Sequence, residues 1–435
     1  MREVSVGQAV AERLYYDSPE LRFAAVVTDI RLVAQERTET GETAQLWKIA
    51  LDRTAFYPES GGQPWDTGRL IARARSGAVL EVSVERVEED ETGEVWHFVR
   101  KPLVQGTEVE GIVDADRRSD HMQQHSGQHL LSAVFLARLG ARTVSFHLGE
   151  ETSTIDLSLG EGVRELDWEP VLEVEEAVNR LIFADRAMTP RWHTRQEAEA
   201  MLASGSLRKL PDRSGPIRVV EMEGVELNAC GGTHVASTGA IGGLQIRSME
   251  RAKQGWRVEF VCGLRAVLAA RRTLALLRQT ATALSVGQGD VPGRVIALQE
   301  ETKGAAKLQR ALLGELADAR AEELLRRTAT GGIVEACFGE KTIEFAKRVA
   351  SVVGASGRAG VIGAVEGNEG CVAVVLPPGD SRHAGQIVRE MSARFGVRGG
   401  GSQTLAQGVC GAQSLRPLVG ALVEKLAGDS VLRTG

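Results

Sequence analysis

Two pairs of residues, each separated by four positions, constrain this chain more than any other feature. One pair is His125 and His129, and the other is Cys230 and His234. On a helix, a separation of four places both imidazoles on the same face, one turn apart. The second pair spans two glycines, which suits a tight turn. One thiolate and three imidazoles are a ligand set typical of zinc, so we predict one tetrahedral metal site built from two distant segments.

A third imidazole complicates the first pair. His121 lies four residues before His125, so the predicted helix carries a row of three histidines on one face. Helix geometry alone leaves open whether a metal is bound by His121 with His125 or by His125 with His129. A histidine pair without a metal is the alternative interpretation. The matched Cys/His pair, in a chain with only five cysteines and eight histidines, favours a metal site.

Several motifs around these pairs occur in the order found in one protein family. They are Phe56–Gly68, His125–Ala133, Ser145–Gly149, Ser153–Asp156 and Cys230–Gly239. Together they resemble the editing domain of alanyl-tRNA synthetase, and over most of the chain they resemble the freestanding alanyl-tRNA editing proteins of the long type. The resemblance implies hydrolysis of tRNA that carries the wrong amino acid. It also implies that the metal ligands, which form the catalytic centre, are His125, His129, Cys230 and His234.

The same resemblance assigns substrate contacts to a glycine-rich loop. In the related editing proteins this loop faces the active site and helps to distinguish serine, which implicates Gly61, Gly62 and Gln63. From the residues alone, a hairpin turn without a ligand is the alternative.

Five further residues are candidates for contact with substrate. They are Ser126, Gln128, His147, Asn228 and Thr233. The first three also have plain structural interpretations: Ser126 as a cap of a backbone group, Gln128 as a residue on the helix surface and His147 as a satisfied core histidine. Asn228 stands where the synthetases commonly have an acidic residue. We therefore expect Asn228 to orient a ligand or the substrate amine rather than to act as a carboxylate base.

The hydrophobic pattern predicts an α+β protein of several domains. Short β-branched runs predict a small N-terminal β-barrel that carries the glycine-rich loop, over residues 1–110. Residues 111–263 alternate strands with helices and form the expected zinc-binding editing domain. Leucine-rich helical patterns over 264–330, with a glycine-rich interruption, predict a helical hairpin or coiled-coil arm. Residues 331–435 form the expected C-terminal α/β domain, which the resemblance identifies as tRNA-binding.

Three helices are expected with particular bounds. The first runs from Asp114 to Leu139, carries the histidine row and is closed by Gly140. In the C-terminal domain we expect helices over residues 340–352 and 383–395.

A run of glycines in the C-terminal domain suggests contact with phosphate. Gly399, Gly400 and Gly401 begin a segment that is similar to the glycine-rich motif in the C-terminal domain of alanyl-tRNA synthetase. A glycine loop before a helix would present bare backbone N–H groups to phosphate. Because the resemblance implies that this domain grips tRNA, we expect the three glycines to bind tRNA without taking part in the chemistry.

Net charge and cysteine content limit the partners and the compartment. The formal net charge of −6 argues against non-specific binding of nucleic acid, although basic residues flank the Cys/His turn in the sequence. Five scattered cysteines do not suggest a disulfide framework, so a reducing cytoplasm is expected. No apolar run of about eighteen residues occurs, and we expect neither a signal peptide nor contact with a membrane. The oligomeric state is left open.

These observations together predict a zinc-dependent trans-editing hydrolase. Its expected substrates are the seryl and glycyl esters of tRNA specific for alanine. A non-catalytic tRNA-binding module is the main alternative. A nucleotide phosphoesterase is a weaker one, because it would need Asp-His-His and further aspartates for two divalent ions, and only Asp120 and His121 fit that pattern. A complete synthetase is not expected, because the ATP-binding aminoacylation domain of that family has no counterpart in the sequence.

Overall fold

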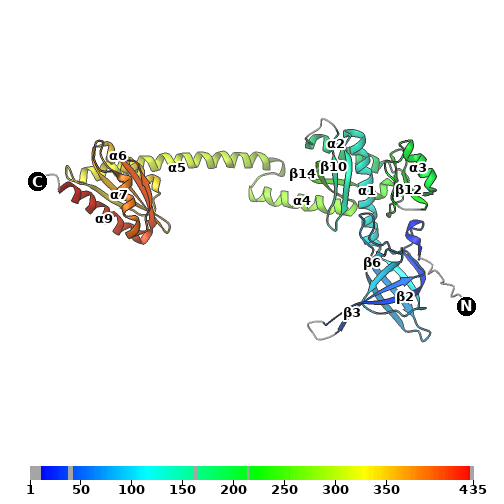
Figure 1. The fold of residues 1–435 in the computed structure, drawn as a ribbon. Helices are drawn as coiled ribbons and strands as arrows, with labels where there is room; N and C mark the ends of the chain where they lie inside the picture. Colours follow the sequence, from blue (N-terminus) through cyan, green and yellow to red (C-terminus); the bar gives the residue numbers. More distant parts are fainter. Residues whose placement is uncertain (1–10, 38–42, 161–164, 213–214, 254, 432–435) are drawn as a thin grey trace. The chain divides into compact units, whose positions relative to one another are not determined.

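The computed structural model describes residues 11–37, 43–160, 165–212, 215–253 and 255–431 (Figure 1). Contacts divide the chain into two compact units, Met1–Leu277 and Arg278–Gly435. The first unit contains a β-barrel and a mixed α/β region that carries the predicted metal ligands. The second contains a long helix and a layered α/β domain. The α+β multidomain fold expected from the sequence is confirmed.

Six strands close into a barrel, in the spatial order β2-β3-β7-β6-β5-β8. They are β2 (Arg22–Arg37), β3 (Thr43–Leu51), β5 (Gly68–Arg73), β6 (Val79–Glu89), β7 (Val95–Val99) and β8 (Glu108–Val113). Inward-facing apolar side chains, among them Ile49, Leu70 and Val87, are fully buried in the barrel core. A short parallel pair, β1 (Glu12–Arg13) with β4 (Arg53–Thr54), and the 3₁₀ turn η1 (Leu14–Tyr16) complete this region.

The glycine-rich segment between β4 and β5 forms a tight turn. Ser60 and Gln63 pair through both backbone hydrogen bonds, at 3.2 and 3.0 Å, and Gly61 and Gly62 between them have φ of 57° and 82°. Positive φ at both central positions is typical of a type I′ turn, which glycine adopts without strain. The turn places the Gln63 side chain in the protein interior, where it is 0% exposed.

A buried ion pair joins this segment to the helix that follows the barrel. The side chains of Asp66 and Arg118 are 0% and 4% exposed, and two guanidinium nitrogens of Arg118 donate to the carboxylate. Arg118 Nη2 also donates to the Ala55 carbonyl at 2.6 Å, and the Tyr57 N–H donates to Asp66 at 2.7 Å. Because all of these partners are buried, the pair fastens the barrel loop to the helix.

Helix α1 (Ala115–Leu139) carries the histidine row, with bounds close to those predicted from the sequence. The Asp114 side chain caps its N-terminus by accepting from two backbone N–H groups of the first turn. Gly140, in the left-handed conformation, ends it. Leu131 and Phe135 in its second half are 0% exposed, so the end of the helix that follows the histidines lies in the core.

Two sheets and two further helices complete the region around α1. The four-stranded antiparallel sheet has the order β14-β15-β10-β9, and the three-stranded sheet has the order β11-β12-β13. The strands are β9 (Arg142–Leu148), β10 (Ser153–Ser158), β11 (Met188–His193), β12 (Ile217–Met222), β13 (Glu226–Ala229), β14 (Leu244–Ala252) and β15 (Gly255–Cys262). The helices are α2 (Trp168–Phe183) and α3 (Arg195–Ala203), with a 3₁₀ turn η2 (Thr238–Ile241). Helices α1 and α2 pack with the four-stranded sheet around one core (Figure 1).

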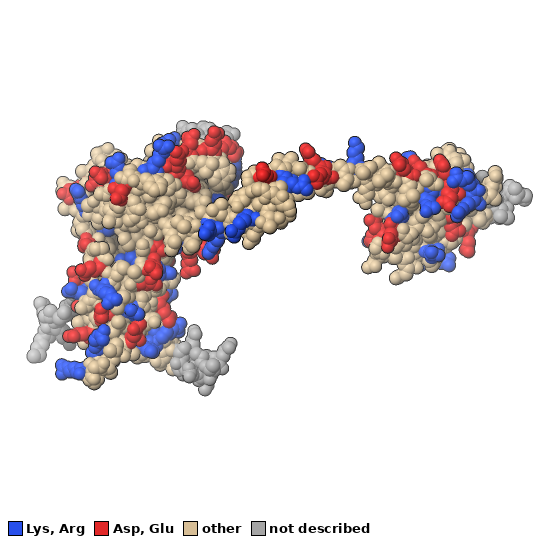
Figure 2. Space-filling view, turned by 180° about the vertical axis from the view of Figure 1, so that it is seen from behind, with Lys and Arg blue, Asp and Glu red and all other residues tan. Residues whose placement is uncertain are grey.

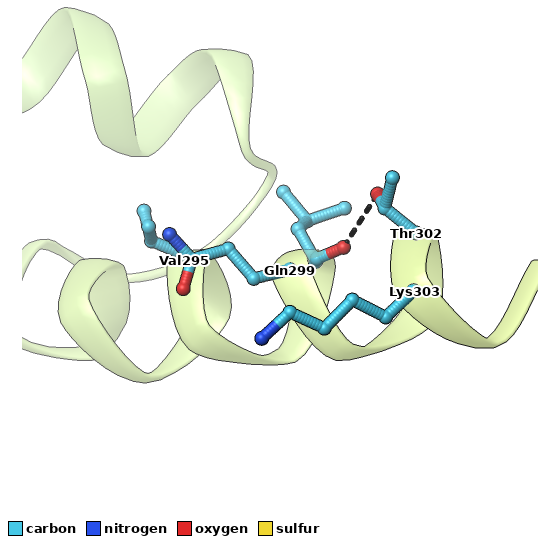
Figure 3. A pocket seen from close by; sticks show the side chains of 5 residues that line it. Val295, Gln299, Thr302 and Lys303 are labelled. Atoms are coloured by element: carbon cyan, nitrogen blue, oxygen red, sulfur yellow. Dashed lines mark hydrogen bonds between the residues drawn. The ribbon is translucent and has the colours of Figure 1, made fainter. Parts of the chain in front are cut away.

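Two helices follow, α4 (Gly263–Ala283) and α5 (Val291–Arg327), and the 3₁₀ turn η3 (Gln288–Asp290) lies between them. The boundary between the two units falls within α4, so the predicted antiparallel hairpin stays a prediction. An open cavity of about 510 Å³ lies along α5 (Figure 3). It is lined by Val295, Leu298, Gln299, Thr302 and Lys303. These side chains form neither a metal-binding nor a catalytic cluster.

The second unit ends in a five-stranded sheet with helices on both faces (Figure 1). The strand order is β16-β17-β18-β20-β19, and only the pair β16 and β17 is parallel. The strands are β16 (Val334–Phe338), β17 (Gly360–Glu366), β18 (Glu369–Val375), β19 (Arg398–Gly401) and β20 (Leu405–Gly411). Helix α6 (Ile343–Ala355) and the end of α5 cover one face, and α7 (Ala384–Glu390) and α9 (Ala412–Val431) cover the other.

Two helices of this domain differ in their bounds from the prediction. Helix α6 begins at Ile343 rather than at residue 340, because the Thr342 side chain caps it by accepting from the Phe345 N–H. The helix expected over 383–395 is divided at Met391 into α7 and α8 (Ser392–Phe395). The apolar spacing continues across Met391, so periodicity could not reveal the division.

Gly399, Gly400 and Gly401 do not form a loop before a helix, which corrects the prediction. They belong to the edge strand β19, which pairs with β20. A Cβ at position 399 would lie 2.1 Å from the Gln407 carbonyl oxygen, and one at position 401 would lie 2.3 Å from that of Leu405. The close approach of the two strands therefore requires glycine at both positions. A Cβ at position 400 would meet nothing within 4 Å, so Gly400 borders open space.

Alanine substitutions should separate the roles of these glycines. Gly399→Ala and Gly401→Ala each force a Cβ into the neighbouring backbone and should destabilise the C-terminal domain by about 1–3 kcal/mol, as overpacking does. Gly400→Ala should change its stability by less than about 0.5 kcal/mol. Hydrogen exchange of the β20 amides measures each effect. Equal protection in all three variants would contradict the packing described for β19.

Candidate metal centre

The four predicted ligands come together, although His125 and Cys230 are 105 positions apart in the sequence. Their ligand atoms all lie within 4.8 Å of one another. His125 Nε2 lies 3.3 Å from His129 Nε2 and 3.5 Å from Cys230 Sγ, and His234 Nε2 lies 3.3 Å from the same sulfur. A tetrahedral ion with ligand distances of about 2.0–2.3 Å separates its ligand atoms by about 3.3–3.7 Å. These three distances fit a tetrahedral ion, and the other ligand atoms lie within 4.8 Å of one another.

Each half of the group is positioned by its own segment. Helix α1 places His125 and His129 one turn apart on a buried face, where they are 1% and 6% exposed. Cys230 and His234 follow β13, and the chain between them bends at Gly232. A Cβ at position 232 would lie 2.1 Å from Cε1 of His125, so only glycine lets this bend approach the helix.

His121 does not join the group. It lies one turn before His125 and is 4% exposed, and its Nδ1 has no hydrogen-bond partner among the described residues. Desolvation lowers the pKa of His121 to about 4, so this imidazole is neutral at pH 7. The fold thus brings His125 and His129, rather than His121, to the Cys/His segment.

Two of the imidazoles are held from their outer side by neighbouring polar groups. Gln63 Oε1 lies 2.9 Å from Nδ1 of His125, and Ser126 Oγ lies 3.2 Å from Nδ1 of His234. The Nε2 atoms therefore face the centre while the Nδ1 atoms face protein groups. This arrangement is typical of histidines that ligate a metal through Nε2.

Two side chains lie at the outer side of His129. Asn228 was predicted there, and Glu226 was not. Its Nδ1 lies 3.0 Å from Nδ2 of Asn228 and 3.7 Å from Oε1 of Glu226. The Glu226 side chain is 6% exposed, and its other oxygen pairs with Arg208. Glu226 and Asn228 alternate along β13 and so share a face, and Cys230 follows at the end of the strand. This alternation is the signal in the sequence from which Glu226 could have been found.

The charge of the group is governed by its thiol. Desolvation alone would raise the pKa of Cys230, but the three imidazoles, His125 foremost, hold that pKa well below its ordinary value. Desolvation also opposes protonation of His129, yet Cys230 and then Glu226 raise its pKa to about 10. Desolvation, followed by the charge of His125, lowers the pKa of His234 to about 3. These shifts favour a thiolate at Cys230 and a protonated imidazole at His129.

Binding of a divalent ion should release about one proton at pH 7. The lowered pKa of Cys230 favours the thiolate before the ion binds, whereas the raised pKa of His129 favours a proton that the ion must displace. Because that pKa lies above neutrality, the apparent metal affinity should rise between about pH 6 and 9. Calorimetry in buffers of different ionisation enthalpy counts the released protons. A count of zero would contradict the charges assigned to this group.

The glycine turn lies beside the centre. Gly61 and Gly62 are exposed. A Cβ at position 62 would lie 2.7 Å from Cε2 of Phe146, and the Phe146 ring stacks on the His125 imidazole with ring centroids 6.0 Å apart. The turn is therefore in contact with a side chain that packs against a candidate ligand.

Gln63, Thr233 and Ser126 adjoin the ligands and form hydrogen bonds within the protein. The Gln63 amide bonds both the backbone N–H and the hydroxyl of Thr233. Ser126 Oγ accepts from the Val235 N–H at 3.2 Å, in addition to its contact with His234. These three side chains thus support the candidate centre through hydrogen bonds within the protein.

Gln128 and His147 form no hydrogen bond with the candidate ligands among the contacts that the structure describes. Gln128 is not on the helix surface but is 5% exposed, and its Nε2 donates to Ser132 Oγ at 2.8 Å. His147 is exposed on β9. Because successive strand residues point to opposite faces, and Phe146 faces His125, His147 lies on the outer face of the sheet. Substrate contacts of Gln128 and His147 stay predictions.

A cavity of about 440 Å³ adjoins the candidate centre. Its wall includes His234, the first turns of α1 and the side chains of Tyr15 and Tyr16 from η1. Arg218 of β12 also lines it, is 4% exposed, and donates to the Cys230 carbonyl at 3.0 Å. Tyr15 and Tyr16 were not predicted, and Arg218 was considered only among the basic residues that flank the Cys/His turn in the sequence.

Basic and acidic side chains are interspersed on the face that Figure 2 shows. Among the basic residues near the Cys/His segment, Arg191, Arg195 and Arg208 each pair with a glutamate. These arginines therefore do not form an uncompensated positive patch. In the part of the chain that the structure describes, no helix has the length and hydropathy needed to span a membrane.

Two family models match the sequence. Residues 2–117 match tRNA synthetases class II (A), and residues 217–259 match the threonyl and alanyl tRNA synthetase second additional domain.

The alanine–tRNA ligase of Pyrococcus abyssi is 30% identical over 415 residues, which cover 91% of this chain and 41% of the ligase. That of Archaeoglobus fulgidus is 33% identical over 403 residues, which cover 91% and 42%. The chain thus spans about two fifths of the length of these ligases. The fold, the four-residue centre and these matches define a protein related to the alanyl-tRNA synthetases.

A further relative identifies the family within this class of protein. The alanyl-tRNA editing protein Aarsd1 of Mus musculus is 34% identical over 308 residues, which cover 70% of this chain and 71% of that protein. The chain belongs to the alanyl-tRNA editing protein family. The crystal structure of the C-Ala domain from Aquifex aeolicus alanyl-tRNA synthetase is 20% identical, with 22% of this chain and 96% of that domain covered, but its TM-score of 0.21 supports no conclusion.

Proposed function

We propose that this chain is a zinc-dependent hydrolase that acts in trans on tRNA specific for alanine and removes serine or glycine wrongly attached to it. The observation that most supports this is the convergence of three imidazoles and one thiolate at the spacing of a tetrahedral ion, in a chain of the editing family. Three nitrogens and one sulfur are a donor set that suits zinc.

Such an activity would remove errors that arise because the selection of alanine for activation is imperfect. A pocket that activates alanine cannot strongly exclude glycine, which is smaller, and serine differs from alanine only by a hydroxyl group. Binding energy alone therefore leaves errors, which a second, hydrolytic site must remove. The alanyl ester itself must be spared by that site.

The bond to be broken is the ester between the amino acid and the terminal ribose. A zinc ion held by His125, His129, Cys230 and His234 would supply Lewis acidity toward the ester carbonyl or a water molecule, or would anchor the substrate. Asn228, beside His129, would orient that ligand or the substrate amine. Cys230 and His234 are partly exposed, so the centre is accessible from one side.

Each of the two units would supply further contacts with the substrate. The exposed turn of Gly61 and Gly62 would meet the amino-acid end of the substrate. The C-terminal domain would bind the body of the tRNA. Of its three consecutive glycines, Gly400 is the one with open space beside it.

A deacylation assay with the purified chain tests the proposal. The substrates are tRNA specific for alanine that carries serine, glycine or alanine, and the metal content is measured on the same sample. We expect hydrolysis of the seryl and glycyl esters, an intact alanyl ester and about one zinc ion per chain. Four protein ligands commonly make a closed structural site, which favours a non-catalytic tRNA-binding module as the second candidate. Binding of tRNA without hydrolysis would identify that module.

A nucleotide phosphoesterase finds less support. That chemistry uses two divalent ions. Among the described residues, the group of four is the only set of three or more His, Cys, Asp or Glu side chains that is close enough to share an ion. Asp120, which such an enzyme would use, is paired with Arg265.

A further inference from the structure

Gln63, which the sequence suggested as a contact for substrate, has its side chain enclosed within the protein. It is 0% exposed. Its Oε1 accepts from the Thr233 N–H at 3.0 Å and lies 2.9 Å from Nδ1 of His125, and its Nε2 donates to Thr233 Oγ1 at 2.8 Å. Both polar atoms of the side chain therefore have protein partners, and neither is presented to a substrate.

These contacts determine which ring nitrogen of His125 carries the proton. A backbone N–H can only donate, so the Gln63 atom that faces the Thr233 N–H must be the amide oxygen. That oxygen also faces Nδ1 of His125 and accepts from it only if Nδ1 carries the hydrogen. Nε2 of His125 is then a free lone pair, directed at His129 Nε2 and Cys230 Sγ at 3.3 and 3.5 Å.

Two apolar contacts restrict the same ring but do not distinguish its nitrogens. Phe146 stacks on the imidazole, with an interplanar angle of 28°. Gly232 also approaches the ring so closely that a Cβ would lie 2.1 Å from Cε1 of His125. These contacts limit rotation of the ring, whereas the Gln63 amide selects the nitrogen that faces the centre.

We propose that Gln63 is a positioning residue of the metal centre, which fixes the orientation and tautomer of His125 and joins the barrel turn to the Cys230–His234 segment. The inference rests on the proposed function only in requiring that the group of four holds a metal. Outer partners of ligating histidines typically contribute 10–100-fold to metal affinity, and we expect a loss of about that size when the amide is removed.

Two substitutions in the full chain test this role. Gln63→Met keeps the length of the side chain but removes both polar atoms, and it should weaken zinc binding about 10–100-fold in a competition with a chelator. Gln63→Glu keeps an oxygen acceptor for His125 and for the Thr233 N–H, so it should restore most of the affinity. The d–d spectrum of the cobalt(II)-substituted protein, which reports ligand geometry, should change with methionine and not with glutamate.

Gln124→Met is the matched control. Gln124 is 1% exposed, and its amide bonds the backbone N–H and carbonyl of Cys262 at 2.8 and 3.1 Å. Its loss should lower the stability of the chain while zinc affinity stays at the native value. An equal loss of zinc affinity in Gln124→Met and Gln63→Met would assign the effect to general destabilisation and overturn the proposal.

Other outcomes are equally decisive. Native zinc affinity in Gln63→Met would overturn the proposal, and so would equal losses in the methionine and glutamate variants. Should Gln63→Met not fold, ¹⁵N NMR of the zinc-loaded native chain replaces it: hydrogen on Nδ1 of His125 supports the proposal, and hydrogen on Nε2 overturns it. A native chain that binds zinc but hydrolyses no aminoacyl-tRNA would refute the proposed function and not this role of Gln63.

Discussion

Cys230→Ala should lose the bound zinc ion and at least about 100-fold of the deacylation rate. The substitution removes the only anionic donor among the four candidate ligands, and even outer partners of metal ligands contribute 10–100-fold to affinity or activity. His125→Ala should have a similar effect, because it removes the imidazole that lies close to both His129 and Cys230. Metal analysis and single-turnover deacylation of seryl-tRNA measure the two losses on the same preparation.

The control for Cys230→Ala is a cysteine elsewhere in the chain. Cys337 is exposed in the C-terminal domain, so Cys337→Ala should keep both zinc and activity. Tryptophan fluorescence checks that Cys230→Ala is folded, since all six tryptophans precede residue 278 and report on the first unit. Native rate and native zinc content in folded Cys230→Ala would refute the catalytic assignment.

Asp66→Asn should destabilise the first unit by about 3–5 kcal/mol, because it leaves the buried guanidinium of Arg118 without its counter-charge. The substitution preserves the size of the side chain, so the loss measures charge and hydrogen bonding rather than a cavity. Urea unfolding followed by tryptophan fluorescence detects this transition separately from the second unit, which contains no tryptophan.

An exposed ion pair provides the comparison for Asp66. Glu176 and Arg180 on α2 form a pair whose side chains are 64% and 77% exposed. Glu176→Gln should change stability by less than about 1 kcal/mol, as expected for a solvated pair. If Asp66→Asn were no more destabilising than Glu176→Gln, the buried pair would not be what fastens the barrel loop to α1.

Local chemistry explains which elements could be predicted from the sequence. Helix α1 was predicted well because its signals are local: Asp114 caps one end and Gly140 ends the other. The spacing of four residues indicated a metal site, and the resemblance to the editing domain then selected His125 and His129 over His121. The structure adds that the two segments meet at a spacing that fits an ion.

Contacts between distant segments explain what could not be predicted. Gln63 was expected at the substrate, and nothing in its own segment indicates that it bonds His125 and Thr233. The alternation of Glu226 with Asn228 places both on one face of β13, but the proximity of Glu226 to His129 depends on how β13 packs against α1. The glycines of β19 were interpreted as a loop. The sequence does not show that the neighbouring strand is so close that a Cβ at position 399 would lie 2.1 Å from a backbone oxygen.

The barrel turn also limits where the chain can be truncated without loss of the candidate centre. Within a few residues, Gln63 and Asp66 supply the partners of His125 and Arg118, which belong to α1. A recombinant fragment that starts at Asp114 would retain all four donor residues yet deprive two side chains of that helix of their native neighbours. Truncation at the end of the barrel should therefore yield aggregated or ion-free material rather than an autonomous enzyme.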